Sequence, residues 1–105
     1  MKGNKTQELK LNIYNNLKKV PRGKVVTYKN LAESVNSKAN RYVGYCMKTN
    51  TSLKIIPCYK VVKSNGEIGN YSAQGGVKKK IELLRKDGIN VIGNKIDLDK
   101  YGFKV

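Results

Sequence analysis

A thiol beside a phenol and a cation is the arrangement in this chain that could carry chemistry. Cys58 directly follows Pro57 and precedes Tyr59 and Lys60, in a stretch without helical periodicity. A nearby positive charge lowers the pKa of a thiol, and the thiolate is the nucleophilic form. The pattern therefore predicts a nucleophilic cysteine in a loop, although the same residues also fit a small cysteine that only packs in a core.

Several residue types that other reactions need are missing. The chain has no His and no Trp, and it has two Cys. The commonest general base and metal ligand is therefore absent. Two Cys without further ligands cannot make a zinc site, and two are too few for a disulfide scaffold. We expect a reduced, intracellular protein that needs no metal and no cofactor.

The charge balance is strongly positive. The 105 residues include 22 Lys and Arg against 7 Asp and Glu, a formal net charge of +15. We expect a single domain over residues 1–105 at this length. So much positive charge favours a polyanionic partner, most simply nucleic acid. An anionic membrane surface competes, but the sequence predicts no basic amphipathic helix and no membrane span. A lysine-rich composition that only maintains solubility explains the same charge.

Hydrophobic spacing predicts helices in the first half of the chain. Leu9, Ile13 and Leu17 recur at helical spacing and predict a helix over 5–19. Thr27 is a good N-cap for a helix over 28–35, and a polar break at 36–37 separates it from a helix over 38–48. Two short helices joined by a tight turn form a helix-turn-helix, here over about 28–48. The second of them carries side chains that suit contact with DNA, namely Lys38, Asn40, Arg41 and Lys48.

The second half is dominated by a long loop over about 50–76, which contains Cys58. A long loop in a small domain usually has a function. Val77, Ile81 and Leu84 then predict a closing helix that stops at Gly88. The last seventeen residues contain Gly93 and Asn94 between short apolar pairs, which fits a hairpin.

The ordered motifs of this chain resemble the active-site, DNA-binding domain of the O6-alkylguanine-DNA alkyltransferases, the methylated-DNA–protein-cysteine methyltransferases. The similarity runs from about Leu9 to Gly88. Six elements in the family's order make it specific. They are Val20-Pro21-Arg22-Gly23-Lys24-Val25-Val26-Thr27-Tyr28 with Leu31-Ala32, Arg41-Tyr42-Val43-Gly44, Asn50 with Ile56-Pro57-Cys58 and Val61-Val62, Ser64-Asn65-Gly66, Gly69-Asn70-Tyr71-Ser72, and Lys80 with Leu83-Leu84.

The resemblance implies a mainly α, small winged-helix-like fold and one irreversible reaction. Cys58 would take the alkyl group from guanine O6 in double-stranded DNA, after the base is flipped out through the minor groove. Arg41 would fill the vacated place in the base stack, and Tyr28 would contact the nucleotide and protonate the departing guanine. By themselves, Arg41 fits a phosphate contact and Tyr28 a core tyrosine. The other implied roles are bracing of the active-site turn by Asn50, DNA contact by Ala39, Asn40, Ser64 and Asn65, and a substrate pocket of Met47, Val61, Tyr71, Ser72 and Lys80.

The chain departs from the family at the residue after the nucleophile. The family normally has a His there, oriented by an acidic residue; here the two positions are Tyr59 and Asp87. A phenol, with a pKa of about 10, is a poor base at pH 7, but a thiol is already about 3% ionised there. Tyr59 could still position a water or relay a proton. We therefore expect Cys58 to react, more slowly.

Rival functions follow from a second departure. The chain starts where the family's usual N-terminal domain would have ended, as in the alkyltransferase-like proteins, which bind the lesion without repairing it and have Trp in place of Cys58. The rivals are thus a lesion-binding protein and a basic helix-turn-helix protein without chemistry. We expect a monomer that binds DNA and no membrane, located in the cytoplasm with the nucleoid or in a nucleus.

Overall fold

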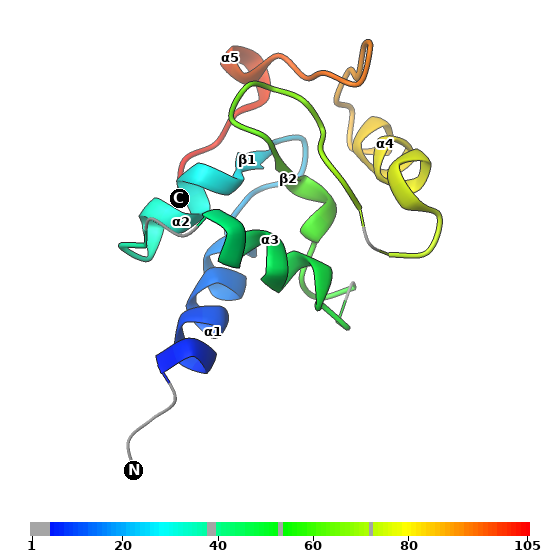
Figure 1. The fold of residues 1–105 in the computed structure, drawn as a ribbon. Coiled ribbons are helices and arrows are strands. Elements are labelled where there is room, and N and C mark those ends of the chain that lie inside the picture. The colour runs from blue at the N-terminus through cyan, green and yellow to red at the C-terminus, as the bar shows by residue number, and fades with distance from the viewer. Residues whose placement is uncertain (1–4, 38–39, 53, 72) are drawn as a thin grey trace.

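Five α-helices surround a two-stranded sheet in the computed structural model, which describes residues 5–37, 40–52, 54–71 and 73–105 (Figure 1). The predicted mainly helical fold is confirmed. The elements in chain order are α1 (Lys5–Leu17), β1 (Val26–Thr27), α2 (Tyr28–Ser34), α3 (Asn40–Lys48), the 3-10 helix η1 (Cys58–Lys60), β2 (Val61–Val62), α4 (Gly76–Lys86) and α5 (Leu98–Tyr101).

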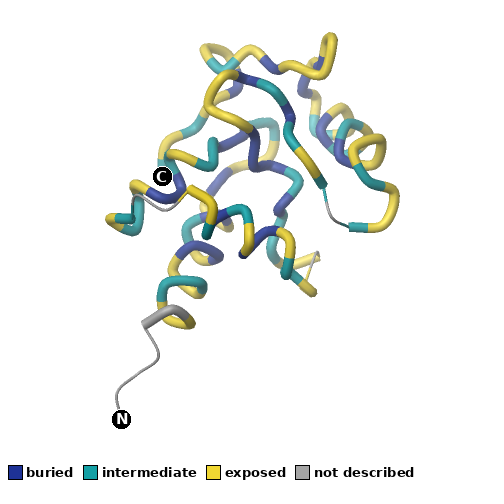
Figure 2. The backbone as a smooth tube through the Cα atoms, viewed as in Figure 1, coloured by how far each residue is buried: buried dark blue, intermediate teal, exposed yellow. Residues whose placement is uncertain are grey.

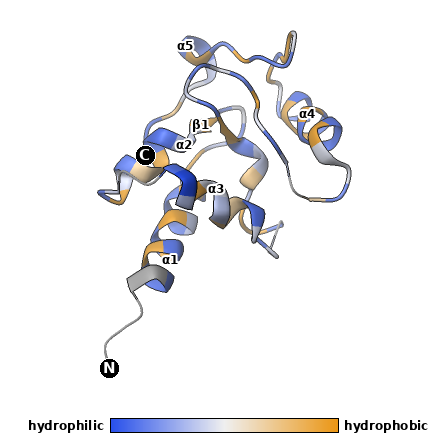
Figure 3. Cartoon of the chain, in the orientation of Figure 1, coloured by the Kyte–Doolittle hydropathy of each residue, from blue (hydrophilic) through white to orange (hydrophobic). Residues whose placement is uncertain are grey.

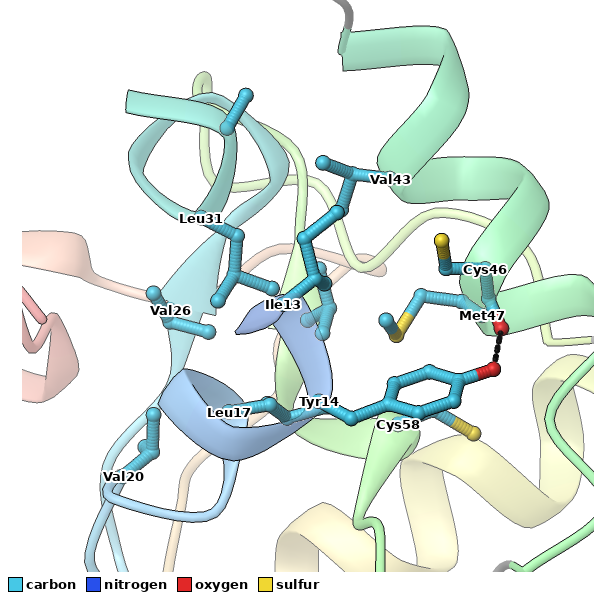
Figure 4. Close-up of a cluster of buried hydrophobic side chains, with 12 residues drawn as sticks. Ile13, Tyr14, Leu17, Val20, Val26, Leu31, Val43, Cys46, Met47 and Cys58 are labelled. Atoms are coloured by element: carbon cyan, nitrogen blue, oxygen red, sulfur yellow. Dashed lines mark hydrogen bonds between the residues drawn. The ribbon is translucent and has the colours of Figure 1, made fainter. Parts of the chain in front are cut away.

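The first three helices enclose the main hydrophobic core. Ile13 and Leu17 of α1, Leu31 of α2 and Val43 of α3 are fully buried in it (Figure 4). The Tyr14 hydroxyl donates a 2.6 Å hydrogen bond to the Cys46 carbonyl, which ties α1 to α3. The side chain of Cys46 is buried, as predicted. The buried stretches of the chain meet between these helices and the sheet (Figure 2).

The sheet brings two distant segments together. Strands β1 and β2 are parallel, with Val26 opposite Val61 and Thr27 opposite Val62. Tyr28 directly follows β1, and η1, which begins at Cys58, directly precedes β2. The pairing therefore holds the start of α2 beside the turn that carries the thiol. The sequence pattern indicated an extended lead into Thr27 but not this pairing.

The predicted helix-turn-helix forms, with α2 packed against α3 (Figure 1). Asn36, two residues after the end of α2, has a φ of 57°, a left-handed conformation that asparagine tolerates and that interrupts the helix. The N–H of Ser37 then donates to the Ala32 carbonyl, 2.9 Å away. The predicted break at 36–37 is therefore confirmed, whereas residues 38 and 39 lie outside the described part of the chain.

Thr27 caps α2 and thereby positions Tyr28. Its hydroxyl oxygen accepts a 3.0 Å hydrogen bond from the backbone N–H of Asn30. We expect Thr27→Ala to lower the free energy of unfolding by about 1 kcal/mol, because that N–H loses its partner. Urea unfolding measures the change, and Thr27→Ser, which keeps the hydroxyl, serves as the control. An equal loss in both variants would contradict the capping role.

A second core joins α4 to the C-terminal segment. Leu84, Ile89, Val91 and Ile96 are buried there beside Val62 of the sheet. The predicted hairpin is present as a tight turn, in which Ile92 and Lys95 exchange 3.0 Å backbone hydrogen bonds. Helix α5 was not predicted from the sequence. Both α1 and α4 carry hydrophobic and hydrophilic residues along their length (Figure 3). Among the described residues, no helix is long and apolar enough to cross a membrane.

Candidate active site

An open cavity of about 440 Å³ lies between α2, α3, η1 and the loop that precedes α4. Six of the residues predicted for a catalytic or binding role lie in its wall. The structure adds residues outside that predicted set, among them Lys48, which the sequence suggested only for contact with DNA. The predicted lining residues are Tyr28, Asn40, Arg41, Met47, Cys58 and Tyr71, and the added ones are Gly44, Lys48, Lys63 and Asn70. Of the other predicted residues, Ala39 and Ser72 lie outside the described part of the chain.

Cys58 lines this cavity from the start of η1. It is only 6% exposed, and its backbone N–H donates to the Ile56 carbonyl at 2.9 Å. Burial raises the pKa of the thiol, while a hydrogen bond from Asn50 and the charge of Lys80 pull that pKa down. The thiol is therefore accessible from the cavity, and its ionisation depends on its neighbours.

Asn50 braces the turn that leads to the thiol. It lies two residues after the end of α3, and its side-chain amide donates to the Ile56 carbonyl at 2.9 Å. Its side-chain oxygen accepts from the backbone N–H of Ser52 at 2.8 Å. Both ends of the amide are thus engaged, which holds the chain just before Pro57 against the end of α3.

Tyr59 and Asp87 meet, although 28 positions separate them. The Tyr59 hydroxyl donates a 2.6 Å hydrogen bond to Oδ2 of Asp87. Burial, followed by the hydrogen bond to the Asp87 carboxylate, raises the pKa of Tyr59 far above its usual value. Arg22 Nε lies 3.5 Å from Oδ1 of the same carboxylate. Tyr59 therefore keeps its proton and points it at Asp87, so it cannot serve as a base for Cys58.

We expect Tyr59→Phe to lower the free energy of unfolding by about 1–3 kcal/mol at pH 7, because a hydrogen bond to a carboxylate is lost. The phenol ionises near pH 10 in the unfolded chain and at higher pH in the folded one. Its contribution is thus complete below pH 10 and is lost as the pH rises further. Urea unfolding of both proteins measures this. A difference that does not shrink above pH 10 would contradict the assignment.

Two phenols face the thiol across the cavity. Burial, and then the nearby Cys58, raise the pKa of Tyr28, and the same two causes raise that of Tyr71. Gly69 lies over the Tyr28 ring at a φ of 73°, where an added Cβ would lie 3.6 Å from the hydroxyl. Both hydroxyls therefore remain protonated near neutral pH and can donate hydrogen bonds to a base that enters the cavity.

Lys80 and Val61, predicted for the substrate pocket, do not line the cavity. Both side chains are fully buried. Lys80 extends from α4 beneath the site, where Nζ donates to the carbonyls of Val61, at 2.7 Å, and Asn70, at 3.0 Å. Lys80 therefore joins the sheet to the loop that carries Tyr71.

Four described residues that were predicted to contact DNA lie around the cavity. Asn40 and Arg41 are exposed at the start of α3. Ser64 and Asn65 line a neighbouring hollow of about 310 Å³, to which Tyr28, Asn40 and Lys63 also contribute. The two hollows are thus adjacent, since they share Tyr28, Asn40 and Lys63. The cations Arg41, Lys48 and Lys63 line the cavity that holds Cys58.

Residues 8–89 match the family model described as 6-O-methylguanine DNA methyltransferase, DNA binding domain. A bifunctional methyltransferase/endonuclease of Picrophilus torridus is 42% identical over 92 residues, which cover 87% of this chain and 30% of that protein. A methylated-DNA–protein-cysteine methyltransferase of Saccharolobus solfataricus is 41% identical over 87 residues, 83% of this chain and 55% of that protein. The chain thus spans from under a third to about half of the length of these relatives.

Solved structures share the fold. S. pombe Atl1, in complex with damaged DNA containing O6-carboxymethylguanine, matches with a TM-score of 0.85 and 25% identity over 100% of both chains. The O6-methylguanine-DNA methyltransferase of Pyrococcus kodakaraensis matches with a TM-score of 0.68 and 40% identity. That match covers 76% of this chain and 46% of the other.

Proposed function

The chain belongs to the 6-O-methylguanine DNA methyltransferase family, whose DNA-binding domain it matches, and from this premise we propose that it repairs O6-alkylguanine in double-stranded DNA by irreversible transfer of the alkyl group to Cys58. The observation that carries the proposal is a single cavity that holds the thiol of Cys58 together with Tyr28, Arg41 and Tyr71. A nucleophile, two proton donors and a cation then surround one base-sized space.

The transfer is a displacement at carbon. The Cys58 thiolate attacks the alkyl carbon, an S–C bond forms, and the C–O6 bond breaks with its electrons passing to guanine. The Tyr28 phenol offers a proton to the guanine as negative charge develops on it, which lowers the barrier. The thioether product has no reverse route, so each chain reacts once.

A duplex base reaches the cavity only after it leaves the stack. Arg41, exposed at the start of α3 beside the entrance, can occupy the space that the base vacates. Gly44, one turn further along α3, has open space where a Cβ would stand, so this helix can approach a narrow groove closely. The minor groove is about 6 Å wide and its base pattern is degenerate, which suits repair at any sequence.

The net charge of +15 supports the same partner. Lysines and arginines release counterions when they neutralise DNA phosphates, so we expect affinity for duplex DNA to fall steeply with salt. Because every basic DNA-binding protein behaves in this way, salt dependence supports DNA binding but not alkyl transfer.

Loss of the lesion from DNA tests the proposal. A duplex with one O6-methylguanine is incubated with the protein, digested to nucleosides and analysed for the remaining O6-methyldeoxyguanosine. We expect the loss to reach one lesion per chain and then stop, because Cys58 is not regenerated. A lesion that persists in the presence of excess protein would contradict alkyl transfer.

A second function, recognition of the lesion without repair, is favoured by Tyr59. Its hydroxyl is committed to Asp87, so the residue beside the thiol supplies no base. Preferential binding to the lesion-containing duplex, together with an undiminished lesion, would assign this function. The presence of Cys58 in the cavity wall favours transfer.

A further inference from the structure

Lys80 is an unusual residue to find beneath a reactive thiol. Lys60 and Lys80 are the buried charged side chains among the described residues, and Lys80 is 0% exposed. A buried charge is costly unless an opposite charge or several hydrogen bonds offset its desolvation. Its position in an apolar interior therefore requires a compensating interaction.

The neighbours of Lys80 are neutral. Its Nζ donates to the carbonyls of Val61 and Asn70 and lies 6.0 Å from the centre of the Tyr28 ring. No carboxylate in the described ranges lies within salt-bridge distance of it. An ammonium group has three N–H donors, so two carbonyls leave one donor and the full charge without an anionic partner.

Cys58 is the group that can become that anion. Helix α4 packs against η1, which begins at Cys58. The Val61 carbonyl bonded by Lys80 belongs to the residue whose own N–H donates to the Cys58 carbonyl. Lys60, by contrast, directs its Nζ to the Val20 carbonyl at 2.9 Å, and Asp87 is held by Tyr59 and Arg22.

We propose that Lys80 is the cation that stabilises the Cys58 thiolate, in place of a proton relay that Tyr59 cannot provide. The inference rests on the proposed transfer to Cys58 and deepens it. The thiol proton passes to solvent, and a thiolate–ammonium pair remains. When the S–C bond forms and the C–O6 bond breaks, the negative charge passes to guanine, and Lys80 is again without an anion.

The ionisation behaviour of the two groups agrees with this pairing. Burial lowers the pKa of Lys80 to about 8, and Cys58 acts in the opposite direction. Burial raises the pKa of Cys58, and Lys80 opposes that rise. Of the other groups that face the thiol, Tyr28 and Tyr71 are neutral phenols with raised pKa values. Lys80 is thus still mostly charged at pH 7. Arg41, Lys48 and Lys63 also line the cavity, but Lys80 is the cation whose charge lowers the pKa of Cys58.

The rate at which iodoacetamide alkylates Cys58, followed by peptide mapping without DNA from pH 6 to 10, tests the pair. In Lys80→Met we expect the midpoint of this profile to rise by at least about one pH unit, which slows alkylation about tenfold at pH 7. Lys80→Arg keeps the charge and should retain most of the wild-type rate. Lys78→Met removes an exposed charge from the same helix and should leave the profile within about twofold. An unchanged profile in folded Lys80→Met would overturn the proposal.

A reciprocal titration covers the case in which Lys80→Met fails to fold. The Lys80 side-chain carbon signals are followed by NMR in the wild type and in Cys58→Ser. The pKa of Lys80 should be lower in Cys58→Ser, because the potential thiolate is gone; equal values would overturn the pair. Neither measurement uses DNA. A shifted profile with an unrepaired lesion would therefore refute the proposed function alone, and repair with an unshifted profile would refute the Lys80 pairing alone.

Discussion

Replacing Cys58 with alanine is expected to abolish methyl transfer completely and to leave binding to lesion-containing duplex DNA unchanged within about twofold. In the proposed reaction the sulfur accepts the methyl group, and no other described side chain in the cavity wall is a comparable nucleophile. Its removal takes nothing from the exposed cations that line the cavity. Lesion loss and a fluorescence-anisotropy titration with the same duplex measure the two properties.

Cys46→Ala is the matched control for this experiment. Cys46 is a free cysteine like Cys58, but it is fully buried in the core between α1 and α3. The same chemical change there should cost stability and leave transfer intact. Transfer that survives in Cys58→Ala, or disappears in folded Cys46→Ala, would show that Cys58 is not the acceptor.

Arg41→Ala is expected to slow transfer from duplex DNA about a hundredfold and to leave the reaction with free O6-benzylguanine nearly unchanged. Flipping a base costs a few kcal/mol, and each 1.4 kcal/mol corresponds to about tenfold in rate. Arg41 lies on the exposed start of α3, where it can contribute to flipping without contacting Cys58. A free base needs no flipping, so it should not report the loss.

Arg41→Lys separates the charge of this residue from its shape. Lysine retains a positive charge for phosphates but lacks the planar guanidinium that stacks in place of a base. We expect Arg41→Lys to bind duplex DNA nearly as tightly as the wild type and to transfer almost as slowly as Arg41→Ala. Equal slowing of the duplex and free-base reactions would assign Arg41 to the chemical step, and a fully active Arg41→Lys would reduce its role to a phosphate contact.

Local sequence signals were sufficient for the helical part of the fold. The spacing of Leu9, Ile13 and Leu17 marks the buried face of α1, which ends at Leu17 rather than at 19. Thr27 caps α2 as predicted, since capping depends on residues three positions apart. The parallel pairing of β1 with β2 was not predicted, because two-residue strands carry no periodicity and their partners lie 35 positions apart.

The candidate site, too, could be predicted only in part from the sequence. The resemblance predicted most of the cavity wall, from Tyr28 to Tyr71, but not what Tyr59 and Asp87 do. Their hydrogen bond depends on how α4 packs against η1, which no local pattern encodes. Lys80 appears as one lysine in a run of three, yet its i, i+4 spacing to Leu84 indicates that it faces the core. That signal was available and distinguishes it from Lys78.

The most direct test of the account is the intact mass of the protein after incubation with duplex DNA that carries one O6-methylguanine, followed by peptide mapping. We predict a gain of one methyl group per chain, located on Cys58 and unchanged when more lesion DNA is added. An unchanged mass, or a methyl group on any other residue, would contradict transfer to Cys58.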